Sequence, residues 1–600
     1  MTALLAAENL FLAGALALLA LLPITEILLR AAFQVGISGA ASLTQHVALI
    51  AGMLGAAVAA REGRLLSLST LDSLLAGRSA LVARFFSRAV AASAAALLCL
   101  AGLDLVFAER AGGNVIAAGI PVWTGQAILP VGFALIAWRL AWSASASWPL
   151  RAATLLLAMG TALPAAIHLP LTDGAVAAAI ALVLLAATFG SPIFTTLGGI
   201  AVILFWREGL PIASVALDHY RMVVNPSLPM IPLFTLAGYF LAEGGAPRRM
   251  IRVFNALFGR LRGGAAIVTV LACAFFTLFS GASGVTIIAL GGMVMPLLLS
   301  AGYSQKHALG LLAGAGSVGG LLPPGLPLVL YALVARISLE DMFLAGIVPG
   351  LLMVGLIAAW GLRHAPPATP NMRKCDWQEA RAALLDAKWE LLLPAVAFSA
   401  LFGGFATPVE AAALTAAYAF VVEVLVYRDL DLRRDVPRVM AGCGLLVGGV
   451  LLILGVALGL TNYLVDARIP EQIVDWVTGA IQSRWLFLIA LNVFLLAAGC
   501  LLDMFSAIVI LVPLLLPLAL AFGMDPVHFG IVFLVNLELG YLTPPVGMNL
   551  FFTAYRFGKP LPEVIRAALP AVAVLAIGLV IVTCLPWVAT ALPQLAKGSP

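Results

Sequence analysis

The chain contains a similar short interruption twice, Gly319-Gly-Leu-Leu-Pro-Pro-Gly325 and Gly540-Tyr-Leu-Thr-Pro-Pro-Val-Gly547. Each Pro-Pro pair interrupts an apolar stretch that would otherwise form one helix. Proline frees backbone carbonyls that hydrocarbon cannot hydrogen-bond, so such a break is tolerated only where it faces protein, water or an ion. We therefore expect two unwound segments whose carbonyls bind cations. A pair of proline kinks without a ligand is the alternative.

The sequence around the two interruptions is repeated at a constant shift of 221 positions, without a gap, between Phe279–Pro349 and Cys500–Pro570. Matched Gly, Pro and His residues at one register are hard to obtain by chance in an apolar chain. The matched pairs are Pro296 and Pro517, Gly302 and Gly523, His307 and His528, Gly319 and Gly540, Pro323-Pro324 and Pro544-Pro545, and Pro349 and Pro570. Duplicated halves around a site of broken helices are typical of secondary transporters.

The composition indicates a protein that lies in lipid. Of 600 residues, 63% are hydrophobic and only 10% are charged, against about 25% charged in soluble domains. At about 20 residues per crossing, the apolar stretches supply well over a dozen helical spans. The net charge of +5 forms no basic tract, which excludes nucleic-acid binding, and the scattered Cys and His residues exclude a disulfide-built fold and a zinc or haem site.

The chain divides into three parts. Apolar runs near 10–29, 41–60, 89–107 and 121–142 predict a four-helix membrane domain over residues 1–150, with no cleavable targeting segment. The arginine-rich loop from 61 to 88 places that loop and the N-terminus in the cytoplasm. Residues 151–172 are expected to form a connecting helix. Residues 173–600 then hold the two repeats, at about 175–362 and 391–592, on either side of the hydrophilic linker Arg363–Glu390.

Two re-entrant hairpins are expected before the breaks, with their tips at Phe279-Ser-Gly-Ala-Ser-Gly284 and Leu502-Asp-Met-Phe-Ser506. Too few residues separate Ile267 from Pro296 for two full spans. The hydroxyls of Ser280 and Ser283 suit a hard cation such as sodium, and Asp503 is an acid deep in an apolar run. Helix packing by small residues is the alternative for the serines, and a helix N-cap is the alternative for Asp503.

Other polar residues favour structural roles. Thr407-Pro-Val-Glu410 is a capping box, which is a better interpretation of Glu410 than a proton carrier. His307 and His528 fall in the first turn of capped helices. Arg336 and Arg556 are expected to snorkel to the interface, with a substrate-carboxylate contact as the alternative. Glu538 leaves both possibilities open, an ion or substrate ligand and a structural acid.

A basic cluster predicts one further element, an amphipathic interfacial helix. It is formed by Arg248, Arg249, Arg252, Arg260 and Arg262.

These motifs, in this order, resemble the tripartite ATP-independent periplasmic (TRAP) transporters. The motifs that carry the resemblance are Phe279-Ser-Gly-Ala-Ser-Gly284, Gly319–Gly325, Gly403-Gly-Phe-Ala-Thr-Pro-Val-Glu-Ala-Ala-Ala413, Asp525-Pro-Val-His-Phe-Gly530 and Asn536–Leu550. The resemblance to the large (M) membrane subunit covers about 175–592. A weaker resemblance to the small (Q) subunit covers about 1–150, so the chain looks like the fused form.

The resemblance implies an all-α polytopic fold: a four-helix small-subunit unit joined to an inverted-repeat ion-transporter-type fold with two re-entrant hairpins and two unwound helices. It implies a sodium-driven, elevator-type importer in the bacterial inner membrane, which receives an organic acid from a periplasmic substrate-binding protein. The implied cofactor is Na⁺, and no enzymatic activity is implied.

The implied sodium ligands are Ser280, Ser283, Gly319, Pro323, Asp503, Gly540 and Thr543. The expected substrate contacts are Ser283, Gly284, Thr286, Pro324, Pro545, Asn549, Glu538 and Arg336. The chain departs from the family in having Val285-Thr286 where two small polar residues are common, which weakens the transfer of substrate contacts at this hairpin.

Two other classes of function remain as alternatives. A stand-alone sodium or proton symporter explains the repeat but leaves the first 150 residues without a role. An integral-membrane enzyme acting on lipid needs clustered His, Asp or Glu near the interface, and the sequence has no such cluster.

Overall fold

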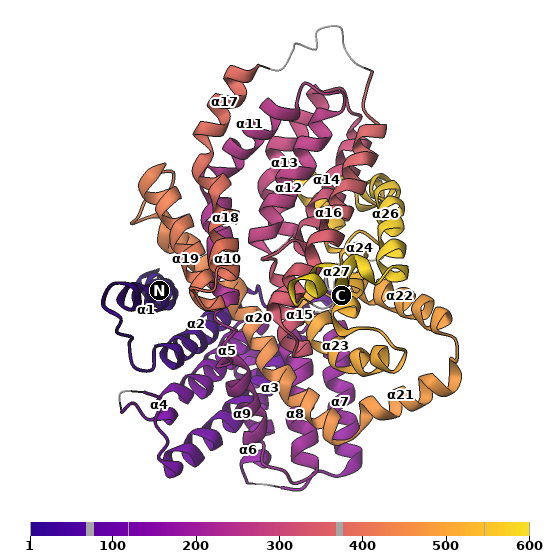
Figure 1. Ribbon diagram of the computed structural model, residues 1–600. Helices are drawn as coiled ribbons and strands as arrows, with labels where there is room; N and C mark the ends of the chain where they lie inside the picture. The colour runs from indigo at the N-terminus through magenta and orange to yellow at the C-terminus, as the bar shows by residue number, and fades with distance from the viewer. Residues whose placement is uncertain are drawn as a thin grey trace. The chain divides into compact units, whose positions relative to one another are not determined.

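The computed structural model describes residues 2–67, 77–117, 119–167, 169–281, 283–367, 376–544 and 547–598. In these residues regular structure is helical, apart from two isolated β-bridges (Figure 1). Among the described residues, twelve helices are long and apolar enough to cross a membrane, or up to thirteen with one bent pair. The all-α polytopic fold is confirmed. Five further apolar helices in these residues have 10–17 residues, so the expected number of spans stays a prediction.

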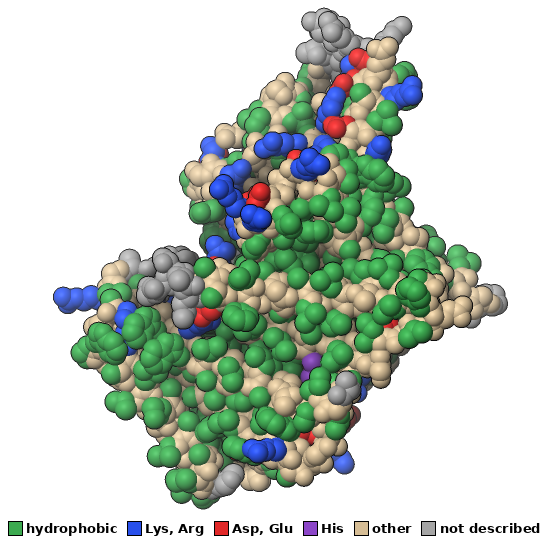
Figure 2. All heavy atoms as spheres, turned by 90° about the vertical axis from the view of Figure 1, so that its left-hand side faces the viewer, with side chains coloured by type: hydrophobic (Ala, Val, Ile, Leu, Met, Phe, Trp, Pro, Cys, Tyr) green, Lys and Arg blue, Asp and Glu red, His purple; other side chains and the backbone are tan. Residues whose placement is uncertain are grey.

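The surface agrees with a lipid environment. Hydrophobic side chains cover most of the face in Figure 2, and the charged ones gather in a few groups. Phe11 is 73% exposed and Leu156 68% exposed. Large exposed apolar areas are unfavourable in water and are expected where side chains face acyl chains.

The chain forms two compact units. The first comprises Met1–Leu233, Ala406–Ala413 and Pro437–Pro470, and the second comprises Phe234–Phe405, Leu414–Val436 and Glu471–Pro600. This division groups helices that pack together. The expected boundaries at 150 and 172 instead separate parts that resemble different subunits, so they stay a prediction.

Most residues of the following helices belong to the first unit: α1 (Thr2–Phe33), α2 (Ala40–Glu62), α3 (Arg78–Gly112), α4 (Val122–Gln126), α5 (Ile128–Ala144), α6 (Trp148–Ala166), α7 (Asp173–Thr188), α8 (Ile193–Arg207), α9 (Ala213–Val223) and α20 (Asp435–Asp466). The four expected N-terminal spans correspond to α1, α2, α3 and α4–α5. Glu8 near the start of α1 pairs with Arg61 at the end of α2 (2.6 Å) and with Arg139 in α5. These ion pairs bring the start of α1 and the ends of α2 and α5 together.

Glycines allow α2 and α20 to cross closely in the first unit. A Cβ placed on Gly55 would lie 2.0 Å from the carbonyl oxygen of Gly444, and one on Gly448 would lie 2.1 Å from the amide nitrogen of Ala56. Small residues at a crossing let two backbones approach, which is how helices associate where lipid provides no hydrophobic drive.

The second unit contains most residues of α10 (Met230–Glu243), α11 (Ala246–Phe258), α12 (Gly264–Ser280), α13 (Ser283–Ser300), α14 (Gln305–Ser317), the 3₁₀ turn η2 (Val318–Leu321), α15 (Leu326–Ala335), α16 (Leu339–Arg363), α17 (Trp377–Asp386), α18 (Lys388–Phe402), α19 (Pro408–Phe420), the π-helical segment η3 (Val421–Val426), α21 (Ile469–Ala480), α22 (Arg484–Leu501), α23 (Met504–Ala521), α24 (Pro526–Gly540), α25 (Met548–Phe557), α26 (Leu561–Cys584) and α27 (Trp587–Ala596).

Helix bounds repeat at the shift read from the sequence. The bounds of α13 and α23, and the starts of α14 and α24, are 221 positions apart, as are the ends of α16 and α26. The packing is reciprocal: α13 contacts α25 as α15 contacts α23, α14 contacts α26 as α24 contacts α16, and α16 contacts α26. Reciprocal pairs of this kind indicate a pseudo-two-fold relation between the repeats.

Two helix hairpins, α12–α13 and α22–α23, have their tips at the expected positions. Because α13, α22 and α23 are long enough to cross a membrane, the re-entrant path of the hairpins stays a prediction. Their helices are longer than expected, since α12 starts at Gly264 and α13 ends at Ser300. Of the five arginines expected on one amphipathic helix, Arg260 and Arg262 lie in the turn that follows it. The helix is α11, which carries Arg248, Arg249 and Arg252 and packs against the linker helix α17. Its Arg252 pairs with Glu379 at 2.9 Å and with Asp386 at 3.0 Å.

Candidate transport site

The first break separates α14 from α15. After Ser317 the helix tightens into η2, and the axes of the two helical pieces differ by 45°. Pro323 and Pro324 are buried and joined by a cis peptide bond. The turn closes where the Gly325 N–H donates to the Leu322 carbonyl at 2.8 Å.

The second break separates α24 from α25. The amide of Leu542 donates to the Leu539 carbonyl at 2.9 Å, and the hydroxyl of Thr543 donates to the same carbonyl at 2.8 Å. The chain re-enters a helix after Gly547, whose φ of 56° lies in the left-handed region that favours glycine. Pro545, an expected substrate contact, lies outside the described residues.

Each hairpin packs against a break through a glycine without room for a side chain. A Cβ on Gly319 would lie 2.6 Å from the Cβ of Thr277 in α12, and one on Gly540 would lie 2.5 Å from the Gly499 carbonyl carbon in α22. Because Gly319 and Gly540 are equivalent in the repeats, both copies use the same close approach.

Hydroxyls gather at the tip of the first hairpin. The oxygen of Thr286 lies 2.8 Å from that of Thr277 and 3.4 Å from that of Ser280. The hydroxyl of Thr277 also reaches the Gly316 carbonyl at 3.0 Å. Ser280 and Thr286 are 2% and 1% exposed. An expected sodium ligand, Ser280, and an expected substrate contact, Thr286, are therefore brought together beside the last turn of α14.

Ser283 and Gly284 face the other repeat. The Ser283 hydroxyl donates to the Asn549 side-chain oxygen at 2.6 Å, and a Cβ on Gly284 would contact the ring of Phe552 at 2.3 Å. Asn549 is 0% exposed, and its amide nitrogen has no hydrogen-bond partner in the described residues. The Asn549 amide is therefore a buried donor beside Ser283, and its expected substrate role stays a prediction.

Asp503 is the N-cap of α23, at the tip of the second hairpin. Its Oδ1 accepts from the amides of Phe505 (3.0 Å) and Ser506 (3.1 Å), and its Oδ2 accepts from the Ser506 hydroxyl. The hydroxyl of Tyr541 accepts from the Met504 amide. The N-cap alternative is therefore present. A carboxylate that caps a helix still has lone pairs for a cation, so its expected sodium role stays a prediction.

Glu538 lies where the two repeats meet. The Ser317 hydroxyl donates to its backbone carbonyl at 2.8 Å, and these residues are 221 positions apart, so equivalent positions touch. The Glu538 side chain is 2% exposed; its Oε1 would lie 2.9 Å from a Cβ on Gly320, and its Oε2 has no partner in the described residues. The acid therefore faces the first break from the second repeat.

Arg336 is not brought to the breaks. It is exposed, in a left-handed conformation at the end of α15, ten helical residues beyond the first break. Arg556 ends up at the matching end of α25, where it packs against Gly292 of α13. Their positions fit the interface better than a substrate carboxylate at the breaks.

Glu410, His307 and His528, for which the sequence favours structural roles, have structural partners. The Thr407 amide donates to Glu410 at 2.7 Å and the Glu410 amide donates to the Thr407 hydroxyl at 3.3 Å, which confirms the capping box. The amide of His307 donates to the Ser304 hydroxyl at 3.3 Å, and that of His528 to Asp525 at 3.1 Å. Both histidines lie in capped first turns, as expected.

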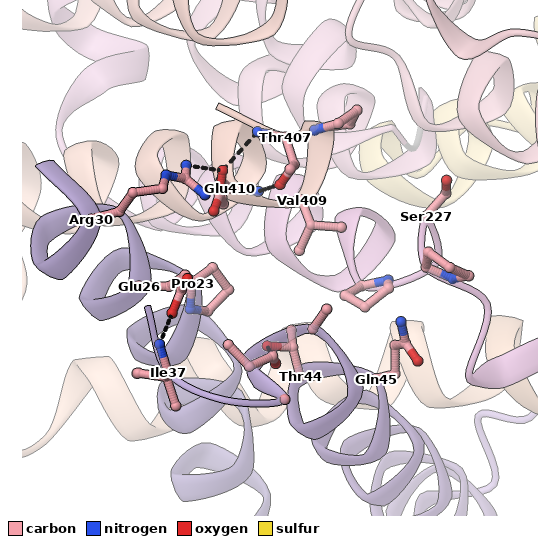
Figure 3. Close-up of a pocket in the computed structure, with 16 residues that line it drawn as sticks. Pro23, Glu26, Arg30, Ile37, Thr44, Gln45, Ser227, Thr407, Val409 and Glu410 are labelled. Carbon is pink, nitrogen blue, oxygen red and sulfur yellow. Dashed lines mark hydrogen bonds and ion pairs between the residues drawn. The ribbon is translucent and has the colours of Figure 1, made fainter. Parts of the chain in front are cut away.

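A separate cavity of about 550 Å³ lies in the first unit, between α1, the start of α2, the segment before α10 and the start of α19 (Figure 3). Its charged groups already have protein partners. Arg30 pairs with Glu410 at 2.9 Å, and Glu26 accepts from the Ile37 amide at 2.6 Å. These contacts favour a structural role for its acids and leave the breaks as the candidate transport site.

Sequence reasoning missed Thr277, Ser317, Ser506 and Tyr541. Isolated Ser and Thr residues in apolar helices usually pack or bond to their own backbone, so they carried little signal. One pattern was available: Thr277 and Ser280 are three positions apart and share a helix face directly before the hairpin tip.

The chain is similar to known transport proteins over most of its length. Residues 176–588 match the family described as the tripartite ATP-independent periplasmic transporter, DctM component, and residues 19–150 match its DctQ component. The C4-dicarboxylate TRAP transporter large permease protein DctM of Pseudomonas aeruginosa is 38% identical over 66% of this chain and 92% of its own length.

Two further relatives carry other names. The isethionate TRAP transporter permease protein DctMQ of Oleidesulfovibrio alaskensis is 33% identical over 66% of this chain and 63% of its own. The ectoine/5-hydroxyectoine large permease protein UehC of Ruegeria pomeroyi is 32% identical over 57% of this chain and 80% of its own.

These matches assign the general class. TRAP permeases are multi-pass proteins of the bacterial inner membrane that work with a periplasmic substrate-binding protein, and they are transporters rather than enzymes. The candidate spans agree with that location. The chain belongs to the TRAP transporter family and joins the small (Q) and large (M) membrane subunits in one polypeptide.

Proposed function

We propose that this chain is the membrane component of a sodium-coupled importer, which receives an organic acid from a periplasmic binding protein and moves it inward by an elevator-type mechanism. The observation that carries the proposal is the pair of broken helices, equivalent in the two repeats and touching at Ser317 and Glu538. Broken helices around a shared point are where secondary transporters place ions and substrate.

Sodium is supported by the chemistry of the two hairpin tips. Sodium is a hard cation that favours oxygen ligands. Ser280 offers a hydroxyl oxygen, and Asp503 supplies a negative charge. The carbonyls of Gly319 and Gly540 each accept one amide, from Leu322 at 3.2 Å and from Thr543 at 3.0 Å, which leaves each a second lone pair for a cation. The expected ligands Ser283, Pro323 and Thr543 lie on the same hairpins and breaks.

An organic anion is supported by the polar groups between the repeats. The orphan amide of Asn549 provides a donor beside Ser283. The names of the relatives mention C4-dicarboxylates, isethionate and ectoines, so we expect a small carboxylate or a related anion. An elevator mechanism requires a scaffold and a mobile domain, and the division into two compact units is compatible with that requirement.

The test is uptake into proteoliposomes that contain the purified full chain, with a periplasmic binding protein of the TRAP family and a radiolabelled C4-dicarboxylate. We expect uptake only with an inward sodium gradient and the liganded binding protein. Equal uptake with a potassium gradient in place of the sodium gradient would contradict sodium coupling. Uptake that persists without the binding protein would favour the stand-alone symporter instead.

A further inference from the structure

The second unit holds a charged cluster, separate from the hairpins and breaks, made of Arg249, Glu390, Glu423 and Asp429. Arg249 donates to Glu390, and its nitrogens lie 3.2 Å from Glu423 and 2.7 Å from Asp429. The side chains of Glu390 and Glu423 are both 0% exposed, that of Arg249 is 13% exposed, and that of Asp429 is 31% exposed. The cluster joins α11 to the first turn of α18 and to the π-helical segment η3.

The cluster has one positive charge for three carboxyl groups. Tyr427 lies 3.7 Å from the Arg249 guanidinium, with its ring below it, and Tyr418 donates to the Trp389 carbonyl. The neighbouring cations have other partners: Arg252 pairs with Glu379 and Asp386, and Lys388 lies over the Trp389 ring.

If all three acids were ionised, the cluster would carry two uncompensated negative charges, partly in a region without water. Buried charge without a partner is strongly unfavourable, whereas a protonated carboxyl is far cheaper to bury.

The hydrogen bonds distinguish the three acids of the cluster. Oε2 of Glu423 accepts from the Gly245 amide at 3.0 Å and lies 3.2 Å from Arg249, and Oε1 lies 3.4 Å from Arg249. Asp429 is in part open to water. Oε1 of Glu390 accepts from Arg249, but its Oε2 is buried without a partner in the described residues.

We propose that Glu390 is a proton-binding site, and that the proton it holds sets how firmly α11 is tied to α18 and η3. A metal ion is a poorer occupant, because a guanidinium occupies the centre of the carboxyl groups and no group of three or more His, Cys, Asp or Glu that could hold a metal occurs in the described residues. The site is independent of the proposed sodium and substrate site.

Glu390 directly follows the hydrophilic α17 and lies outside the helices long enough to span a membrane. Burial raises the pKa of Glu390 above its ordinary value, and the hydrogen bond and charge of Arg249, a backbone hydrogen bond and the hydroxyl of Tyr427 lower it only in part. A raised pKa in the folded state means that the folded protein holds a proton that the unfolded chain releases above about pH 4.3. Stability is therefore highest at low pH and falls as pH rises through the pKa of folded Glu390.

The test is thermal unfolding of the purified full chain in nanodiscs between pH 5 and pH 8.5, for the wild type, Glu390→Gln and the control Glu379→Gln. Glutamine imitates the protonated acid, so we expect the Tm of Glu390→Gln to change much less with pH. Each unit by which the pKa is raised corresponds to about a tenfold loss of the folding equilibrium constant at high pH. Glu379 is 44% exposed on α17, so the control should keep the wild-type dependence.

Infrared difference spectroscopy provides a second readout. A protonated-carboxyl band present in the wild type at pH 7 should be missing from Glu390→Gln. The proposal is overturned if Glu390→Gln keeps the wild-type pH dependence, or if it is destabilised most at high pH, since that result identifies an ionised partner of Arg249. It is also overturned if sodium instead of protons stabilises the wild type and the variant does not respond.

Discussion

The two copies of the repeat share their backbone but differ in charge. Both have a hairpin, a glycine at the close approach and a Pro-Pro break at matching positions. Yet residues 264–335 contain no Asp or Glu, whereas residues 484–557 contain Asp503, Asp525 and Glu538. The first copy therefore offers hydroxyls and carbonyls, and the second adds carboxylates. Backbone shape is therefore kept by the duplication, while negative charge at the hairpin and break occurs in one copy alone.

The largest effect is expected where the shared backbone is disturbed. Gly540→Ala would place a Cβ 2.5 Å from the Gly499 backbone, and Gly319→Ala would place one 2.6 Å from Thr277. We expect both variants to lose about 1–3 kcal/mol of stability through overpacking and to lose uptake. Uptake in proteoliposomes and thermal unfolding are the measurements.

Gly355→Ala is the matched control for these variants. It lies within α16 and has nothing within 4 Å of its added Cβ, so uptake and Tm should stay close to wild type. Wild-type uptake by Gly540→Ala would show that the second break does not need its close approach to the hairpin.

The second effect concerns the charge that only one copy carries. Asp503→Asn keeps a side chain that caps helices equally well, so folding should change little. Loss of the negative charge should weaken sodium binding by about 1.5–3 kcal/mol, roughly 10-fold to 100-fold in the concentration for half-maximal uptake. Ser280→Ala, at the uncharged tip, should weaken it less.

The measurement is the sodium dependence of uptake for both variants, with Tm as the control for folding. If Asp503→Asn keeps the wild-type sodium dependence, Asp503 acts only as a helix N-cap. A larger effect of Ser280→Ala would reverse the proposed asymmetry between the copies.

The third effect concerns the contact between the copies. Ser283→Ala removes the 2.6 Å hydrogen bond to Asn549, which is buried. We expect a loss of about 0.5–1.5 kcal/mol of stability and a raised KM for substrate. A double-mutant cycle with Asn549→Ala checks the pair: if the two effects simply add, the hydrogen bond does not couple the repeats.

The smallest effect is expected for a carboxylate of the second half that is not at a break. Glu410→Gln keeps an oxygen for the Thr407 amide and weakens a partly exposed pair with Arg30, whose side chain is 45% exposed. Such pairs contribute about 0–1 kcal/mol. Uptake by Glu410→Gln should match the wild type at several pH values. If the variant loses a pH dependence of uptake that the wild type shows, Glu410 carries protons.

The sequence was most informative where residue types restrict the backbone. Paired prolines and register-matched glycines predicted both breaks and the repeat. Proline pairs are not tolerated inside a regular helix, and glycine is required where the backbone is left-handed or closely packed. The helix bounds that recur at a shift of 221 positions are the structural counterpart of those matches.

Long-range contacts were beyond sequence reasoning. How the repeats pack decides two contacts, that of Ser317 with Glu538 and that of Ser283 with Asn549. The exposed position of Arg336 depends on the length of α15, since ten helical residues carry it about 15 Å beyond the break.

The most direct test of the central claim is equilibrium binding of radioactive sodium to the purified full chain, without the binding protein. We expect saturable binding that potassium does not displace, that Asp503→Asn weakens strongly, and that Gly355→Ala leaves unchanged. The absence of saturable binding, or equal binding by the wild type and Asp503→Asn, would contradict it.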